Sequence, residues 1–447
     1  MNPLRRVLAR REGGVLLRRA VLGVAGRLSW GVADQILSSG SNFLVSVYIA
    51  RTLGAYSYGA FSLVYITYSF ALNASRGLAT DPLLVRFSGT DVPAWRHAVA
   101  KCTGTAVAVG LTLGTLALAA GLLMRGATGS AFLALAITMP GLLLQDSWRY
   151  AFFAVGRGGR AMLNDGICAV ALVGALVSLR TLGHATVFWS VFAWGGAAFL
   201  GAVIGPIQAG VRPQLREARQ WLSAHRDLGW RYLAEGTSNS AGNQLRSYGV
   251  GLILGVAAVG YLQAATTLMG PFTVIFFGMG LVALPEAARA LRRSSRHMVV
   301  FCALLSCALA ALAMAWGATL MVALPRGLGG WLLGSVWKPT DPLILPVTLS
   351  MVGGSLSTGP TMALHALGAA KRSLRAMVAW SIAYVVCSLL GAWWGGALGA
   401  ARGTAVASLI GVALLWRELR LALRERQDTS SAPVLESEPV SVMTAEL

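Results

Sequence analysis

The sequence predicts an all-α integral membrane protein with 12 transmembrane helices in two six-helix lobes related by a parallel pseudo-two-fold repeat. Three observations predict it: an apolar composition, the placement of the arginines and an internal repeat. Of the 447 residues, 56% are hydrophobic and only 12% are charged. The charged share is about half of the roughly 25% found in soluble globular proteins. This number of polar residues is too small to cover the surface of a soluble protein of this length. The chain therefore belongs in a membrane.

Apolar runs of about 20 residues recur along the chain, each long enough to cross the roughly 30 Å hydrocarbon core as a helix. The predicted spans are residues 29–50, 57–75, 99–123, 129–152, 162–180, 186–209, 230–254, 257–283, 298–324, 342–366, 374–396 and 398–416. The second span has no sharp end before Leu84, and the last two are joined by a short turn around Gly399.

The basic residues predict the orientation, because short cytoplasmic loops retain Lys and Arg. With the N-terminus in the cytoplasm, 30 of the 37 basic residues lie in cytoplasmic segments, six lie outside, and Arg246 falls within the seventh span. This alternation explains the net charge of +20 as a topology signal and not as a nucleic-acid surface. Both termini are therefore expected in the cytoplasm, with the chain in the cytoplasmic (inner) membrane.

The two ends of the chain differ from the spans. Residues 1–28 carry seven arginines and no uninterrupted apolar core, so we expect a basic cytoplasmic arm drawn to anionic lipid headgroups. Residues 421–447 become polar and aperiodic after Asp428, so we expect a disordered cytoplasmic tail.

An internal repeat appears when the chain is aligned with itself at an offset of 201 residues. This offset aligns Asn42 with Asn243 and Asp34 with Glu235. The same offset aligns further pairs: Ser39 with Ser240, Leu44 with Leu245, Ser46 with Ser247, Leu53 with Leu254, Gly54 with Gly255 and Gly59 with Gly260. Six spans separate the copies, so both have the same orientation, and a substrate path is expected at their interface. The predicted parts are an N-lobe at 29–209, an interfacial linker helix at 210–229 and a C-lobe at 230–420. A solvated loop is the alternative for the linker.

Polar side chains inside the first and seventh spans are the candidate site, because such residues at membrane depth usually face a protein-lined or watery cavity. Asn42, Asn243 and Gln244 could bind substrate, or the two asparagines could simply form hydrogen bonds between helices. Asp34 and Glu235 lie about one turn from the cytoplasmic side. They are candidates for gating or ion coupling, with a position at headgroup level as the alternative.

Arg246 is the sharpest of these candidates, since no acid lies within one helical turn of it. Facing lipid, it would cost several kcal/mol (about 2.5 or more). Facing a central cavity, its guanidinium would suit an anionic ligand such as a phosphate. The alternative is a buried pair with an acid from another helix.

The fourth span ends in a polar segment where Asp146 and Arg149 are spaced to pair on one helical face. With Arg76, they are predicted at the cytoplasmic mouth. No Walker A loop, metal-ligand spacing or catalytic motif occurs, so we expect no enzyme, no metal and no cofactor. A gradient of H⁺ or Na⁺, or consumption of the substrate, would have to supply energy.

Over roughly residues 29–420, the sequence resembles the multidrug/oligosaccharidyl-lipid/polysaccharide exporter superfamily, and within it the polysaccharide (O-antigen type) flippase branch. The resemblance rests on Asp34–Gln35 with Ser41–Asn42, and on the segments Ala50–Phe61, Arg76–Leu84 and Gln145–Phe153.

The resemblance implies a flippase that moves an oligosaccharide linked to polyprenyl pyrophosphate across the membrane by alternating access. Arg246 with Asn42, Asn243 and Gln244 would suit pyrophosphate and sugar hydroxyls. The implied partners are the lipid-linked oligosaccharide, membrane lipids, and the polysaccharide polymerase and glycosyltransferases, but no nucleic acid. The alternatives are a cation-coupled multidrug exporter, which would favour an acidic cavity, and a non-transporting scaffold of a glycan-assembly complex. A lipid II flippase would have fourteen spans.

Overall fold

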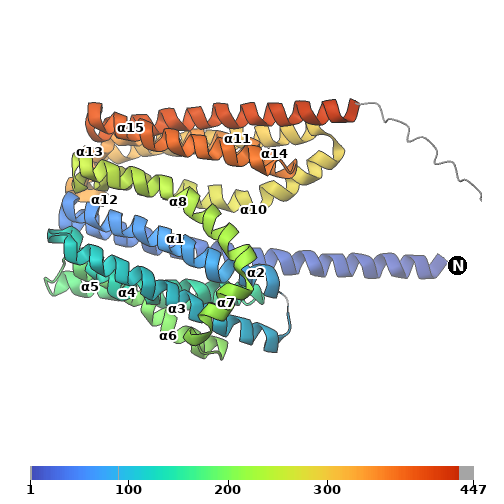
Figure 1. The fold of residues 1–447 in the computed structure, drawn as a ribbon, viewed down its shortest axis with the longest axis horizontal. Helices are drawn as coiled ribbons and strands as arrows, with labels where there is room; N and C mark the ends of the chain where they lie inside the picture. Colours follow the sequence, from blue (N-terminus) through green and yellow to red (C-terminus); the bar gives the residue numbers. More distant parts are fainter. Residues whose placement is uncertain (1–2, 89, 432–447) are drawn as a thin grey trace, which may run out of the picture.

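Every element in the described part of the computed structural model is helical (Figure 1). The structure describes residues 3–88 and 90–431, without the side chains of residues 3–29, 32, 234–239, 277–278, 280–282, 284–285, 326, 370 and 427–431. The first half forms α1 Pro3–Ser75, the π-helix η1 Arg76–Thr80, α2 Asp81–Phe87, α3 Val92–Leu123, α4 Gly126–Ala154, α5 Gly158–Thr181 and α6 Val187–Ala209. A 3₁₀ turn, η2 Leu215–Glu217, and α7 Ala218–Ala224 follow.

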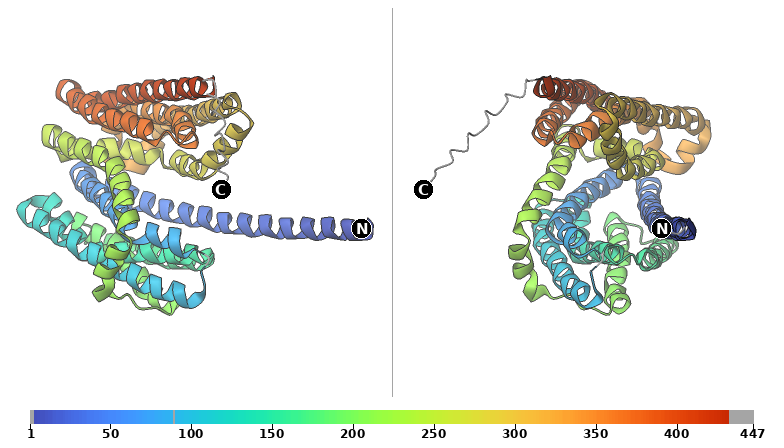
Figure 2. Two further views of the ribbon diagram at one scale, coloured as in Figure 1. Left: turned by 45° about the vertical axis from the view of Figure 1, so that its right-hand side comes forward. Right: turned by 90° about the vertical axis from the view of Figure 1, so that its right-hand side faces the viewer.

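The second half contains the longer helices α8 Arg226–Leu254, α9 Val256–Leu268, α10 Gly270–Arg293, α11 Ser295–Ala323, α14 Ile344–Ala366 and α15 Ala370–Ser431. Short helical pieces connect α11 to α14: η3 Leu324–Leu328, α12 Gly329–Leu333, η4 Gly334–Val336, α13 Trp337–Thr340 and η5 Asp341–Leu343. Figure 2 shows that the first part of α1 projects beyond the other helices, so the backbone of the predicted basic arm is helical.

The protein is a multi-pass membrane protein. In the described part of the chain, seven helices are long and apolar enough to cross a membrane, or eight if the bent pair α9 and α10 forms one span. Neither α1 nor α8 is among them. These two helices carry the polar residues of the first and seventh predicted spans. The candidate in α15 covers residues 371–426 as one helix, although α15 is broken at Gly395 and Gly396.

Glycines in the left-handed region break the two helices that the repeat aligns. Gly54 has φ 77° inside α1, and Gly255 has φ 86° between α8 and α9. Glycine adopts these angles readily because it has no Cβ. The two positions are aligned by the offset of 201, so the equivalent helix breaks occur at equivalent places in the sequence.

The helices form two groups that meet along α1, α8 and α9. In one group α3, α4, α5 and α6 pack around α1 (Figure 1). In the other, α10 and α11 pack against α14, and α14 packs against α15, which also contacts α8. Across the boundary, Asn73 Nδ2 donates to Ser240 Oγ at 2.6 Å, and Arg86 Nη2 lies 2.7 Å from Asp227 Oδ2.

A reciprocal glycine contact brings α1 and α9 together at this boundary. A Cβ added to Gly59 would lie 1.9 Å from the carbonyl oxygen of Val256, and one added to Gly260 would lie 2.9 Å from that of Ala55. Positions 55 and 59 align with 256 and 260 at the offset of 201, so each helix presents the same glycine to the other. Small residues allow helix backbones to approach this closely in membranes.

The end of α15 corrects one expectation. The predicted disordered tail from residue 421 is wrong for residues 421–431, which continue α15 as a helix. The reason is that its apolar face stays packed: Leu419 and Ala422 are buried against Met298 and Leu364. Arg372, at the start of α15, also pairs with Glu418 near its end, at 2.9 Å. Residues 432–447 lie outside the described part.

The linker is shorter than predicted and is attached to the first group. Helix α7 ends at Ala224, and α8 starts at Arg226, inside the predicted linker 210–229. The amide of Gln214 donates to the carbonyl of Ala100 at 2.8 Å, and Lys101 Nζ lies 2.8 Å from Glu217 Oε2.

Replacing Gly59 with Ala should lower the thermal unfolding midpoint of the purified protein in detergent. The new methyl would meet a backbone oxygen that cannot move alone, so overpacking should cost about 1–3 kcal/mol. Gly174→Ala is the matched control, since a Cβ there meets nothing within 4 Å. Equal midpoints for the two variants would contradict the packing described for α1 and α9.

Candidate functional site

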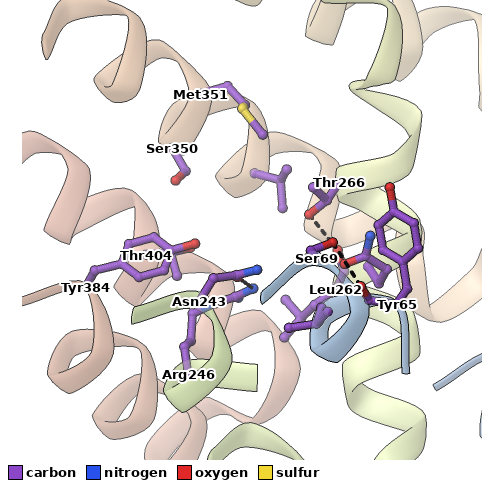
Figure 3. Close-up of a pocket in the computed structure, with 13 residues that line it drawn as sticks. Tyr65, Ser69, Asn243, Arg246, Leu262, Thr266, Ser350, Met351, Tyr384 and Thr404 are labelled. Carbon is purple, nitrogen blue, oxygen red and sulfur yellow. Dashed lines mark hydrogen bonds between the residues drawn. The ribbon is translucent and has the colours of Figure 1, made fainter. Parts of the chain in front are cut away.

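A cavity of about 160 Å³ lies between the two helix groups (Figure 3). Helices from both groups contribute to its wall. The lining residues are Tyr65, Ile66 and Ser69 of α1, Asn243 and Arg246 of α8, Leu262, Gln263 and Thr266 of α9, Val347, Ser350 and Met351 of α14, and Tyr384 and Thr404 of α15. Among the described side chains, these include several hydroxyl and amide groups but neither Asp nor Glu. The single formal charge in this described lining is therefore that of Arg246.

Arg246 is 9% exposed and is held by two neighbours. Its Nη2 donates to Asn243 Oδ1 at 3.0 Å, and its guanidinium lies 5.4 Å from the ring centre of Tyr384. Its Nε is buried and has no hydrogen-bond partner among the described residues. The ion pairs of the described side chains do not include Arg246 either. The guanidinium thus keeps, at the cavity, a charge that no described acid pairs with and a buried N–H that has no described partner.

The other predicted substrate-binding residues occupy different places. Asn243 lines the cavity beside Arg246. Asn42 does not line the cavity. Its Oδ1 accepts a hydrogen bond from Trp194 Nε1 of α6 at 3.2 Å, so Asn42 joins two helices, as the alternative interpretation of the sequence allowed. Gln244 is also outside the lining, because its Nε2 donates to the carbonyl of Ile66 at 3.1 Å and so joins α8 to α1.

A second polar site lies inside the first helix group, where Arg149 binds two carboxylates. Its guanidinium contacts Asp34 through Nη2, and its Nε lies 2.8 Å from Asp34 Oδ2 and 3.2 Å from Asp165 Oδ2. The Asp34 side chain is fully buried, and its Oδ1 has no hydrogen-bond partner within the described part of the chain. Asp34 is therefore an interior residue paired to α4.

The predicted mouth residues belong to the same cluster. Arg76 holds Asp146 with two hydrogen bonds, at 2.9 Å from Nε and 2.7 Å from Nη2. Asp146 Oδ1 also lies 3.9 Å from Arg149 Nη1, so the predicted pair on one helical face is present. This distance is longer than those from Arg76 and Arg149 to their other carboxylate partners. Three carboxylates and two guanidiniums of the described residues thus form one network, which contains one more negative than positive charge when all are ionised.

Sequence reasoning missed Asp165, which this network requires. Asp165 accepts from Gln145 Nε2 at 2.5 Å as well as contacting Arg149. The available signal was an acid next to Asn164 near the start of a predicted span. Glu235, predicted with Asp34 for gating or ion coupling, lies outside the described side chains.

Comparisons with known proteins give fold matches alone. A comparison with models of protein families finds no match, and a comparison with curated proteins also finds none. Among solved structures, the chain is similar to an inward-facing conformation of a multidrug resistance MATE family transporter of the MOP superfamily. The TM-score is 0.71 at 15% sequence identity, over 89% of this chain and 96% of that chain.

Two further structures support the same fold. Lipid II flippase MurJ, in an inward closed conformation, matches with a TM-score of 0.63 at 12% identity, over 88% of this chain and 87% of that one. A MOP superfamily transporter from Pyrococcus furiosus, described as having a binding pocket of reverse polarity, matches with a TM-score of 0.54 at 14% identity, over 90% and 95%. The chain therefore has the fold of MOP superfamily transporters.

Replacing Arg149 with Met should destabilise the protein by about 3–5 kcal/mol, because it leaves buried Asp34 and Asp165 without their cation. Thermal unfolding in detergent measures this loss. Arg289→Met is the matched control, since Arg289 and its partner Glu286 are 63% and 39% exposed, and should cost about 1 kcal/mol or less. A loss no larger than the control's would mean that the network does not stabilise the first helix group.

Proposed function

We propose that the protein is a flippase of the polysaccharide branch, moving an oligosaccharide linked to polyprenyl pyrophosphate from the cytoplasmic to the outer leaflet of the cytoplasmic membrane. The observation that carries the proposal is the charge of the cavity: among the described residues, its lining holds one buried guanidinium, whose Nε has no hydrogen-bond partner, and no acid. A guanidinium is well shaped to bind phosphate oxygens through several hydrogen bonds. A cavity for cationic drugs would instead need negative charge.

The rest of the cavity supports a substrate that is anionic and rich in hydroxyls. Ser69, Gln263, Thr266 and Ser350 line it together with Asn243, and such groups can donate to and accept from sugar hydroxyls. The polyprenyl chain would remain in the bilayer, which is as apolar as the chain itself. The matched structures include a lipid II flippase and multidrug transporters, so the fold alone does not select a substrate class, and the proposal is supported by the charge of the described cavity lining.

The proposed topology has 12 spans in two lobes, at 29–209 and 230–420, with both termini in the cytoplasm. Helices α1 and α15 would each form two membrane spans. The chain would turn between the two spans at Gly54 in α1, and at Gly395 and Gly396 in α15. Rocking of the lobes about the contact of Gly59 with Gly260 would open the Arg246 cavity to one side and then to the other.

The buried network around Asp34 would couple transport to an ion gradient. Among the described side chains, its three carboxylates exceed its two guanidiniums by one charge, and Asp34 Oδ1 is without a partner. A buried excess charge is costly, so the network should take up H⁺ or Na⁺. Binding and release of that ion would then change how tightly α1, α4 and α5 are held together.

The direct test of the function is a strain that lacks the protein, complemented with variants. Loss should remove surface polysaccharide and leave lipid-linked oligosaccharide in the cytoplasmic leaflet, without new sensitivity to cationic drugs. Arg246→Ala should fail to restore surface polysaccharide although the protein is inserted and folded, and Arg246→Lys should restore part of it because the charge remains.

The matched control is Arg402→Ala, an exposed arginine of α15 outside the cavity lining, which should restore export fully. Full export by Arg246→Ala would remove this residue from the mechanism. Intact surface polysaccharide in the deletion strain, with new sensitivity to cationic drugs, would make the protein an extrusion pump.

Asp34→Asn should abolish the response of transport to an ion gradient, because the amide cannot take up a proton and carries no charge to bind Na⁺. In proteoliposomes, an imposed pH gradient or Na⁺ gradient should accelerate translocation of a labelled lipid-linked oligosaccharide by the wild-type protein. Asp227→Asn, which changes a carboxylate that is 56% exposed, should keep the response. A gradient response that survives Asp34→Asn would disprove the coupling role.

A further inference from the structure

A second cavity, of about 220 Å³, lies beside the Arg246 cavity between α8 and α15. It is lined by Gly242, Asn243, Met377, Trp380, Ser381 and Tyr384. Asn243 and Tyr384 also line the first cavity, so the two cavities share a wall (Figure 3 shows these two side chains from the first cavity). A ligand whose two parts are joined by a short link could occupy both.

Aromatic rings form one side of this second cavity. Trp380 and Tyr384 are four residues apart on α15, so they lie on the same helical face. The pyrrole ring of Trp380 packs on Gly411 in the second half of α15, where a Cβ would lie 2.7 Å from its atoms. The indole is therefore held in one position by the helix behind it.

The indole N–H of Trp380 is buried and has no hydrogen-bond partner among the described residues. A buried donor without an acceptor costs free energy, which a ligand oxygen would recover. Gly242 contributes no side chain to the opposite wall, and an added Cβ there would be in ordinary contact with Ser381 Cβ at 3.8 Å. The cavity thus combines aromatic side chains with space in front of them, and it is bordered by a buried indole N–H that has no partner among the described residues.

We infer that this second cavity is the subsite for the sugar ring that is bonded to the pyrophosphate, an inference that rests on the proposed function. The apolar face of a pyranose ring would lie against the aromatic side chains, and one of its oxygens would accept from Trp380 Nε1. The shared wall would place this sugar next to the phosphate held by Arg246, matching the covalent order of the substrate. Aromatic rings can also bind cations, but the Arg246 guanidinium already lies 5.4 Å from the Tyr384 ring and would repel one.

The experiment measures binding of two lipids to the full-length protein in nanodiscs. One probe is polyprenyl pyrophosphate without sugar, and the other is the same lipid carrying a single N-acetylhexosamine. The wild-type protein should bind the sugar-bearing lipid more tightly. Trp380→Phe, which keeps a ring but removes the N–H, should weaken binding of the sugar-bearing lipid by roughly two- to tenfold and leave the bare lipid unchanged.

Two further variants separate the sugar subsite from general damage. Gly242→Leu should fill the cavity and lower the affinity for the sugar-bearing lipid alone. Trp394→Phe, on the same helix but with its side chain 80% exposed, should change neither affinity. Equal affinities of the wild-type protein for the two lipids, or an equal loss for both in Trp380→Phe, would overturn the inference alone. Failure of the wild-type protein to bind either lipid would overturn the proposed function and this inference with it.

Discussion

A charged side chain inside a membrane must either be paired with an opposite charge or face a polar cavity, and this constraint organises the whole protein. The chain meets it in two ways. In the first helix group, Arg149 and Arg76 are paired with three aspartates. At the boundary between the groups, Arg246 has no acid partner among the described residues and lines a cavity instead. The paired charges stabilise the first helix group, whereas the unpaired charge is available to a ligand.

The boundary between the groups depends on glycine. Gly59 and Gly260 allow α1 and α9 to touch through their backbones, and Gly54 and Gly255 allow the chain to turn before each of those contacts. The cavity lies further along the same helices, where α1, α9, α14 and α15 supply hydroxyl groups and α8 supplies the guanidinium. Side chains also join the two groups there, since Tyr58 hydrogen-bonds to Thr267 at 3.3 Å and Thr67 to Tyr248 at 2.5 Å.

Much of this arrangement could be predicted from the sequence, for identifiable reasons. The helical membrane fold follows from composition, and the fold matches support it. The equivalence of Gly54 with Gly255 follows from the repeat, because a positive φ leaves few other residues acceptable. Arg246 stood out because a charge in an apolar span is costly. The sequence of that one span was enough to identify Arg246 as a candidate.

Contacts between distant helices could not be predicted in the same way. Asn42 and Asn243 are equivalent in the repeat, yet only Asn243 lines the cavity, because Trp194 of α6 takes the amide oxygen of Asn42. Asp165 was missed since nothing local links it to Arg149, sixteen positions earlier on another helix. The extent of α15 past residue 420 depends on Arg372 and its partner Glu418, which lie at opposite ends of the same broken helix. Each of these depends on which helix faces which, and periodicity within one span does not determine that.

The most direct test of the central claim is a translocation assay with purified protein. Proteoliposomes would contain a fluorescent lipid-linked oligosaccharide with a pyrophosphate group, and a membrane-impermeant quencher would report how much label reaches the outer leaflet. The account predicts that wild-type protein exposes the label from the inner leaflet, while Arg246→Ala protein of equal stability does not. Translocation that is equally fast without the arginine, or transport of a cationic dye in place of the glycolipid, would contradict it.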